Sequence, residues 1–111
     1  ALSERTRLVR GWTIVCGDYR EASKYVEGEA TWYFDPPYEG TPGQAYGPQF
    51  GSAALDYAAL ADYVRSRHGQ VIVSERASAA WLPFEQLKLV RNRAAVEYWE
   101  GLFYVPESPT E

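Results

Sequence analysis

Two consecutive prolines, Pro36 and Pro37, follow an apolar run at residues 30–34 and constrain this chain more than any other feature. Proline has no amide hydrogen to donate to a strand ladder, and it pushes the preceding residue toward an extended backbone. The run ATWYF is therefore predicted to be a strand that ends before Asp35. The glycine-rich segment at residues 38–51 has no apolar periodicity and is predicted to be a long loop.

Other apolar runs predict further strands. Residues 12–17 (WTIVCG) and 70–74 (QVIVS) are short and rich in β-branched side chains, which is typical of buried strands. The run at 70–74 is nearly continuous in apolar residues, so we expect it to be buried on both faces of a sheet. Two more strands, at residues 87–91 and 98–105, are expected to pair antiparallel.

Helices are predicted between these strands. Asp18 is placed to cap a helix over residues 18–28, with Glu21 in a capping box and Gly28 as a left-handed end. Ser52 is predicted to cap a second helix. Its apolar face is expected to contain Leu55, Ala58, Ala59, Ala61 and Val64.

The order strand, helix, strand, helix, strand predicts an open α/β sheet. We expect three parallel strands with crossover helices and a C-terminal antiparallel hairpin. With 111 residues, of which 46% are hydrophobic, residues 1–111 have enough apolar surface for one domain but not for two. The polar tail at residues 106–111 is expected to fray.

Composition argues against several classes of protein. Cys16 and His68 are single residues of their kinds, so neither an intrachain disulfide nor a zinc site of Cys and His ligands is expected. Because no apolar run approaches the roughly 20 residues that span a membrane, we expect a soluble, intracellular protein. The net charge is −4, yet residues 63–93 carry six Lys or Arg and two acids. They are compatible with a local basic surface for nucleic acid, and equally with ordinary solvated charge.

The residues after the strand at 30–34 indicate chemistry on an aromatic amino group. Ligand sites in open α/β sheets lie beyond the carboxyl ends of the strands, where Asp35 is expected. The Asp35 carboxylate and the Pro36 carbonyl oxygen can accept from the two N–H groups of such an amine, and the prolines restrict the movement of both acceptors. Tyr38 can stack on the base once it has left a duplex. The plainer alternative is that Asp35 only caps a turn.

The sequence Asp35-Pro36-Pro37-Tyr38 after an apolar strand resembles the catalytic motif of DNA adenine N6 methyltransferases, in the group that includes the DNA adenine methyltransferase. The similarity extends over residues 10–105 as an ordered set of segments: GDY at 17–19, WYFDPPY at 32–38, VIVSE at 71–75 and, as in phage-type members, WLPF at 81–84. It implies the C-terminal half of a Rossmann-like catalytic domain, in a cytoplasmic protein of bacterial or phage context.

The resemblance also implies functional roles for individual residues. Asp35, Pro36 and Tyr38 would hold the target adenine of DNA. S-adenosylmethionine is the implied cofactor, and its implied contacts are Asp18, Tyr19 and Pro37.

The loop residues Tyr46 and Phe50 would close over the extruded base. Each of these roles has a structural alternative: Asp18 as the helix cap above, and Tyr46 and Phe50 as ordinary loop anchors. Arg76 is a candidate for a phosphate contact or, more simply, a surface residue. The aromatic side chains of Trp32, Tyr33 and Phe34 are expected to belong to the core.

The sequence departs from the family in its cofactor motif. The nine glycines include no G-x-G pair, and neither an acid for the ribose hydroxyls nor a target-recognition segment is visible. We therefore expect the isolated chain to be inactive. It would be a piece of a longer protein, a half completed by a second chain or by self-association at an exposed sheet edge, or a remnant. RNA or cytosine N4 methyl transfer, and a catalytically silent binding or assembly module, are the alternatives.

Overall fold

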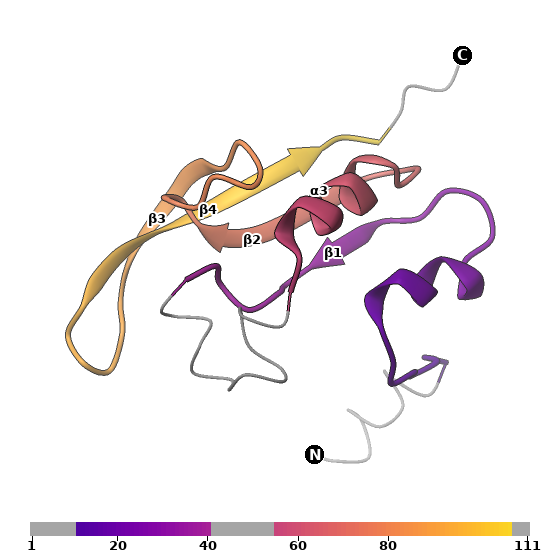
Figure 1. Ribbon diagram of the computed structural model, residues 1–111, viewed down its shortest axis with the longest axis horizontal. Helices are drawn as coiled ribbons and strands as arrows, with labels where there is room; N and C mark the ends of the chain where they lie inside the picture. The colour runs from indigo at the N-terminus through magenta and orange to yellow at the C-terminus, as the bar shows by residue number, and fades with distance from the viewer. Residues whose placement is uncertain (1–10, 41–54, 108–111) are drawn as a thin grey trace.

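A computed structural model describes residues 11–40 and 55–107 of the chain. Within these ranges the chain forms a mixed α/β fold around one four-stranded sheet (Figure 1). The elements, in order, are the 3-10 helix η1 (Tyr19–Tyr25), β1 (Trp32–Phe34), α3 (Tyr57–Arg65), β2 (Val71–Arg76), β3 (Glu85–Arg91) and β4 (Glu97–Val105).

The four strands lie in the order β1-β2-β4-β3. β1 is parallel to β2, whereas β4 runs antiparallel to both of its neighbours, β2 and β3. β3 therefore points in the same direction as β1 and β2. The expected C-terminal hairpin is confirmed, and α3 forms the crossover between the two adjacent parallel strands. The described residues thus contain an α/β sheet with one such crossover.

The chain that enters β1 lies very close to the junction between α3 and β2. The amide of Trp32 donates to the carbonyl oxygen of Gln70 at 2.7 Å, and the amide of Ala30 donates to His68 at 3.4 Å. Gly69 lies between these acceptors with φ at +106°, and a Cβ there would collide with the carbonyl oxygen of Ala30. Only glycine satisfies both the left-handed backbone and this contact.

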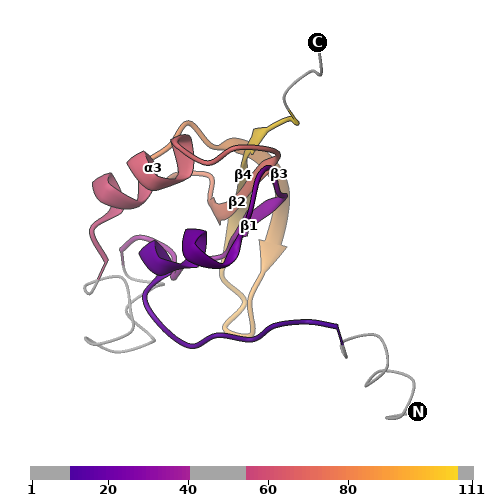
Figure 2. The same cartoon turned by 90° about the vertical axis from the view of Figure 1, so that its right-hand side faces the viewer.

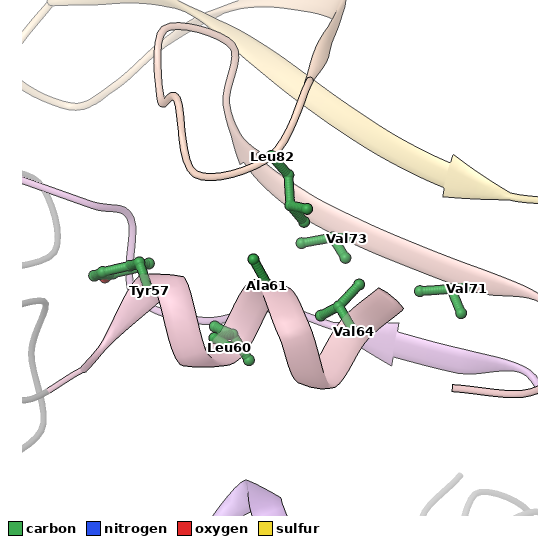
Figure 3. Close-up of a cluster of buried hydrophobic side chains, with 7 residues drawn as sticks. All are labelled: Tyr57, Leu60, Ala61, Val64, Val71, Val73 and Leu82. Atoms are coloured by element: carbon green, nitrogen blue, oxygen red, sulfur yellow. The ribbon is translucent and has the colours of Figure 1, made fainter. Parts of the chain in front are cut away.

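The core forms between one face of α3 and the inner face of β2 (Figure 3). The spacing i, i+3, i+4, i+7 places four side chains of α3 on that face. These side chains lie against two valines of β2 and a leucine from the segment after it; the buried set is Tyr57, Leu60, Ala61, Val64, Val71, Val73 and Leu82.

The sequence prediction for α3 was right in part. Ala61 and Val64 are buried as expected, but Ala58 is exposed, and Tyr57 and Leu60 are the members that it missed. The observed N-cap is Asp56, whose side chain accepts a hydrogen bond from the amide of Ala59 at 3.1 Å. The expected cap, Ser52, lies outside the described residues, as do the end of the tail at 108–111 and most of the loop at 38–51.

The prediction of two-sided burial for β2 was too strong. Its side chains alternate between fully buried and partly exposed. Figure 2 shows why: α3 and η1 lie on the same side of the sheet. The partly exposed side chains of Ile72, Ser74 and Arg76 point to the other side.

The strand predicted at residues 12–17 is wrong. These residues form no strand, and Trp12, Ile14 and Val15 are largely exposed. High β-propensity does not produce a strand without a neighbour to pair with, and no described strand pairs with this run. The helix predicted at 18–28 is reduced to η1, which buries no residue and so gains little from packing.

Candidate functional site

The predicted amino-group site lies where the chain leaves β1. The strand ends at Phe34, and Asp35 follows it as an exposed residue at the carboxyl end. Asp35, Pro36 and Pro37 line a hollow of about 290 Å³ together with Tyr19, Tyr33, Phe34, Leu55 and Leu60. The acid and the prolines therefore border open space rather than packed interior.

Both expected acceptors remain available within the described part of the chain. Among the described residues, none donates a hydrogen bond to the Asp35 carboxylate or to the Pro36 carbonyl oxygen. The fixed φ of the two prolines limits the alternative positions of these oxygens. The residues that carry the two oxygens line one hollow, and together they can accept two hydrogen bonds from an amine.

The backbone around Tyr38 is held at both of its peptide groups. Before Tyr38, the carbonyl oxygen of Pro37 accepts a hydrogen bond from the Tyr57 hydroxyl at 2.6 Å. After Tyr38, the amide of Glu39 donates to Oε2 of Glu75 at 3.1 Å. Contacts from α3 and from β2 thus fix the turn on either side of the tyrosine.

Glu75, like Tyr57, is a residue of this site that was not predicted from the sequence. It is fully buried, at 0% exposure, and it also accepts from the Trp81 indole at 2.8 Å and from the Arg76 amide at 2.7 Å. Burial raises its pKa above the ordinary value, although these hydrogen bonds oppose the shift. An acid placed directly after the apolar run VIVS was the available signal.

The ring of Tyr38 lies outside the hollow. It packs edge-on against Tyr98, with 6.3 Å between the ring centroids, and it is partly exposed. Desolvation by burial is the main cause that raises the pKa of Tyr38 to about 12, and the nearby Glu100 carboxylate adds to it. The hydroxyl is therefore neutral at physiological pH, and the ring does not share the space that Asp35 and Pro36 border.

Asp18 has the capping role expected for it. Its Oδ1 accepts from the Arg20 amide at 2.9 Å, and the Arg20 guanidinium forms two further bonds, to Oδ1 and Oδ2, each at 2.9 Å. These bonds from Arg20 lower the pKa of Asp18 to about 2. The pair is exposed, so its contribution to stability is small.

A second hollow, of about 310 Å³, adjoins Asp18. Its lining includes Val15, Gly17, Asp18, Tyr19 and Tyr25. Tyr19 also lines the hollow beside Asp35, where its ring packs edge-on against Tyr63 with 5.2 Å between the centroids. The two hollows therefore share one aromatic side chain.

The hollow beside Asp18 has one carboxylate acceptor and two aromatic side chains in its lining, the kinds of group that the adenine end of the implied cofactor would need. The Asp18 carboxylate stays ionised and can accept from an amino group, and Tyr19 and Tyr25 offer aromatic surface. Because both carboxylate oxygens already accept from Arg20, a ligand would share them with that guanidinium. Pro37 lines the hollow beside Asp35, and its carbonyl oxygen accepts a hydrogen bond from the Tyr57 hydroxyl.

The remaining candidate residues have mixed positions. Trp32 and Phe34 pack against the core as expected, but Tyr33 is 61% exposed and its hydroxyl bonds to that of Ser74 at 2.9 Å. Its assignment to the core was wrong, because Tyr33 points to the uncovered side of the sheet. Tyr46 and Phe50 lie outside the described residues.

Arg76 is more than a plain surface residue. Its guanidinium lies over the ring of Tyr98, 4.8 Å from the centroid, and its Nε is buried with no hydrogen-bond partner among the described residues. Arg65 and Arg67 also lie over rings, those of Phe103 and Tyr63. Part of the basic segment is thus engaged with aromatic side chains.

Neither a metal site nor a membrane-spanning helix occurs in the described ranges. No group of three or more His, Cys, Asp or Glu side chains that could hold a metal ion occurs in residues 11–40 and 55–107. In the same ranges, no helix has the length and apolar character needed to cross a membrane.

Comparisons with known proteins found no relative of this chain. No protein-family model, no curated protein and no solved structure matched the chain.

Proposed function

We propose that this chain carries the base pocket and part of the cofactor pocket of an S-adenosylmethionine-dependent methyltransferase that acts on N6 of adenine in DNA. One observation carries the proposal: Tyr19 lines both the hollow beside Asp35 and the hollow beside Asp18. A base held at the first hollow and a methyl donor held at the second would meet at this side chain.

The chemistry proposed for Asp35 and Pro36 is the positioning of an exocyclic amine. The lone pair of such an amine is delocalised into the ring, so the nitrogen is a weak nucleophile. Two acceptors aimed at its N–H groups favour the pyramidal form, whose lone pair is available for attack. The exposed position of Asp35 supports a second role, in which it passes the proton lost by the nitrogen to water.

Asp18 and Tyr19 are proposed to hold the adenine end of S-adenosylmethionine, which supplies an electrophilic methyl group when bound. The position of Asp18 supports this role, because Asp18 is exposed and lines the second hollow. Pro37 lines the hollow beside Asp35 and not the hollow beside Asp18, and its carbonyl oxygen accepts from Tyr57, so its implied contact with the cofactor gains no support. Because the Tyr38 ring lies outside the hollow beside Asp35, it is proposed to stack only on a part of the base that extends beyond that hollow.

Exposed apolar groups support a form that is completed by a further segment or chain. β1 stands at one end of the described sheet, with a free edge. Ile14 is 87% exposed, in a run that has the composition of a strand. An unpaired edge and an uncovered apolar run are typical of surfaces that associate.

Two measurements test the proposal. Calorimetric titration with S-adenosylmethionine, together with transfer of labelled methyl groups to short DNA, asks whether the chain binds the cofactor and methylates adenine. Asp35→Ala is expected to abolish transfer and leave the fold intact, because Asp35 is exposed. Asp62→Ala, which removes an exposed acid from α3, is the matched control and should leave transfer unchanged.

The alternatives are distinguished by the same experiments. If the methyl group is found on cytosine, or on RNA, the proposed substrate is wrong but the proposed site stands. Full activity in Asp35→Ala would remove Asp35 from the mechanism. If the chain neither binds the cofactor nor transfers a methyl group, alone or with a candidate partner, the silent binding module becomes the better description.

A further inference from the structure

The geometry points to Glu75 as the positioning residue of the amino-group site: its buried carboxylate holds the amide of Glu39 and so aligns the turn that carries Asp35, Pro36 and Tyr38. This inference rests on the proposed function for its chemical consequence. Its structural part, the hold on the turn, is independent of any methyl transfer.

Placing an acid at this position has an energetic cost. Glu75 is 0% exposed at the end of β2, with Gly101 of β4 opposite it in the sheet. Burying a carboxylate in a small domain is unfavourable unless its oxygens receive hydrogen bonds. An apolar residue would continue the alternating burial of Val71 and Val73 at no such cost.

The Glu75 carboxylate accepts hydrogen bonds from three donors. Oε1 accepts from the amide of Arg76, within the same strand. Oε2 accepts both from the Glu39 amide, in the segment before β2, and from the Trp81 indole, in the segment after it. The bond to Glu39 spans 36 positions of sequence and reaches the peptide group directly after Tyr38.

A second hydrogen bond holds the same turn. The Tyr57 hydroxyl holds the carbonyl oxygen of Pro37, the peptide group directly before Tyr38. With one peptide group held from α3 and the next from β2, the backbone of Tyr38 cannot rotate freely. A displacement of about 1 Å in a positioning element can cost 100-fold in rate, so such restraint matters for two acceptors that must meet one amine.

The direct test is a titration of the wild-type protein followed by NMR. The titratable groups near the carboxylate are the Glu39 side chain and the hydroxyls of Tyr57 and Tyr38. We expect the amide proton of Glu39 and the indole proton of Trp81 to shift with the same midpoint as the Glu75 carboxyl carbon. A Glu39 amide that does not follow this carbon would overturn the inference.

Two variants separate positioning from general stabilisation. Glu75→Gln keeps the size of the side chain but offers one acceptor oxygen where three donors converge, so the Glu39 amide should exchange with solvent at least about tenfold faster. Trp81→Phe removes another of these donors and keeps an aromatic ring. It is expected to leave the exchange of Glu39 within about twofold of wild type.

Transfer kinetics supply the functional readout. If the wild type methylates adenine, Glu75→Gln should lower kcat by about 10- to 100-fold without changing cofactor affinity, whereas Trp81→Phe should retain kcat. Equal losses in both variants, or a wild-type rate in Glu75→Gln, would reject the positioning role. Failure of the proposed function is a separate result: the wild type then transfers no methyl group, whatever the NMR titration shows for Glu39.

Discussion

The hydroxyl of Tyr57 donates a hydrogen bond to the carbonyl oxygen of Pro37 over a distance of 2.6 Å. Tyr57 belongs to the buried core, and its ring packs on Trp81 with 5.3 Å between the centroids. Pro37 belongs to the turn that carries the candidate acceptors. The helix that closes the core therefore also fixes the site, which couples the stability of the fold to the geometry of the turn.

Removing this hydroxyl should weaken the fold slightly. Tyr57→Phe keeps the packed ring but loses the bond to Pro37, so we expect the free energy of unfolding to fall by about 1 kcal/mol. Urea denaturation measures the change. Tyr63→Phe is the control, because the Tyr63 hydroxyl is buried with no partner in the described part of the chain and its removal should be neutral or stabilising. An equal loss in both variants would contradict the assignment of the bond.

Two glycines with left-handed backbones should differ in their tolerance of alanine. Gly28 has φ at +72° and open space where a Cβ would stand, so Gly28→Ala should cost about 1 kcal/mol. Gly69→Ala adds a collision with the Ala30 carbonyl oxygen and should cost about 1–3 kcal/mol more. Thermal unfolding of both variants gives the comparison. Similar losses would mean that β1 does not approach the α3–β2 junction this closely.

The pH dependence of stability should carry the signature of Glu75. Burial raises its pKa in the folded protein above the ordinary value of 4.5, so the folded state binds more protons than the unfolded state between these two values. The contribution of this residue to stability is therefore fully present below pH 4.5 and is lost as the pH rises through the folded pKa.

Urea denaturation across this pH range, on the wild type and on Glu75→Gln, measures the effect. The wild-type free energy of unfolding should decrease with pH relative to that of the variant, because the variant cannot titrate at this position. Parallel curves for the two proteins would show that the buried carboxyl does not have the raised pKa.

The pKa of Asp18 is shifted in the direction opposite to that of Glu75. Its hydrogen bonds from Arg20 hold its pKa at about 2, below the ordinary value of 3.8. Replacing Arg20 by alanine should return the pKa toward 3.8, as followed by the carboxyl carbon in NMR. Glu21→Gln is the control, because the Glu21 side chain pairs with Lys24 and only the Glu21 backbone amide bonds to Asp18, at its carbonyl oxygen. A low pKa that persists in Arg20→Ala would have to come from another group.

Local covalent constraints explain which parts of the fold were predictable. The end of β1 was predicted from Pro36, because proline ends a ladder regardless of the surroundings. The hairpin of β3 and β4 and the helix α3 followed from composition and apolar spacing. The four residues of the candidate site from Asp35 to Tyr38 were likewise found as a short motif.

The features that were not predicted depend on strand pairing and on contacts between residues far apart in the sequence. The run at 12–17 has the composition of a strand, but a strand also needs a partner at its side, and sequence alone does not supply one. Tyr57 and Glu75 were not recognised because their bonds to the turn span 20 and 36 positions of sequence. Such partners are known only once the chain has folded.

By itself, the sequence determined where the backbone must turn and which residues stand at the end of β1, since these depend on neighbouring residues. The tertiary structure alone decided that Asp35 and Pro36 border open space, that Tyr19 lines two hollows and that a buried acid holds the turn. The physical reason is that desolvation and hydrogen bonding depend on groups brought together from distant parts of the chain.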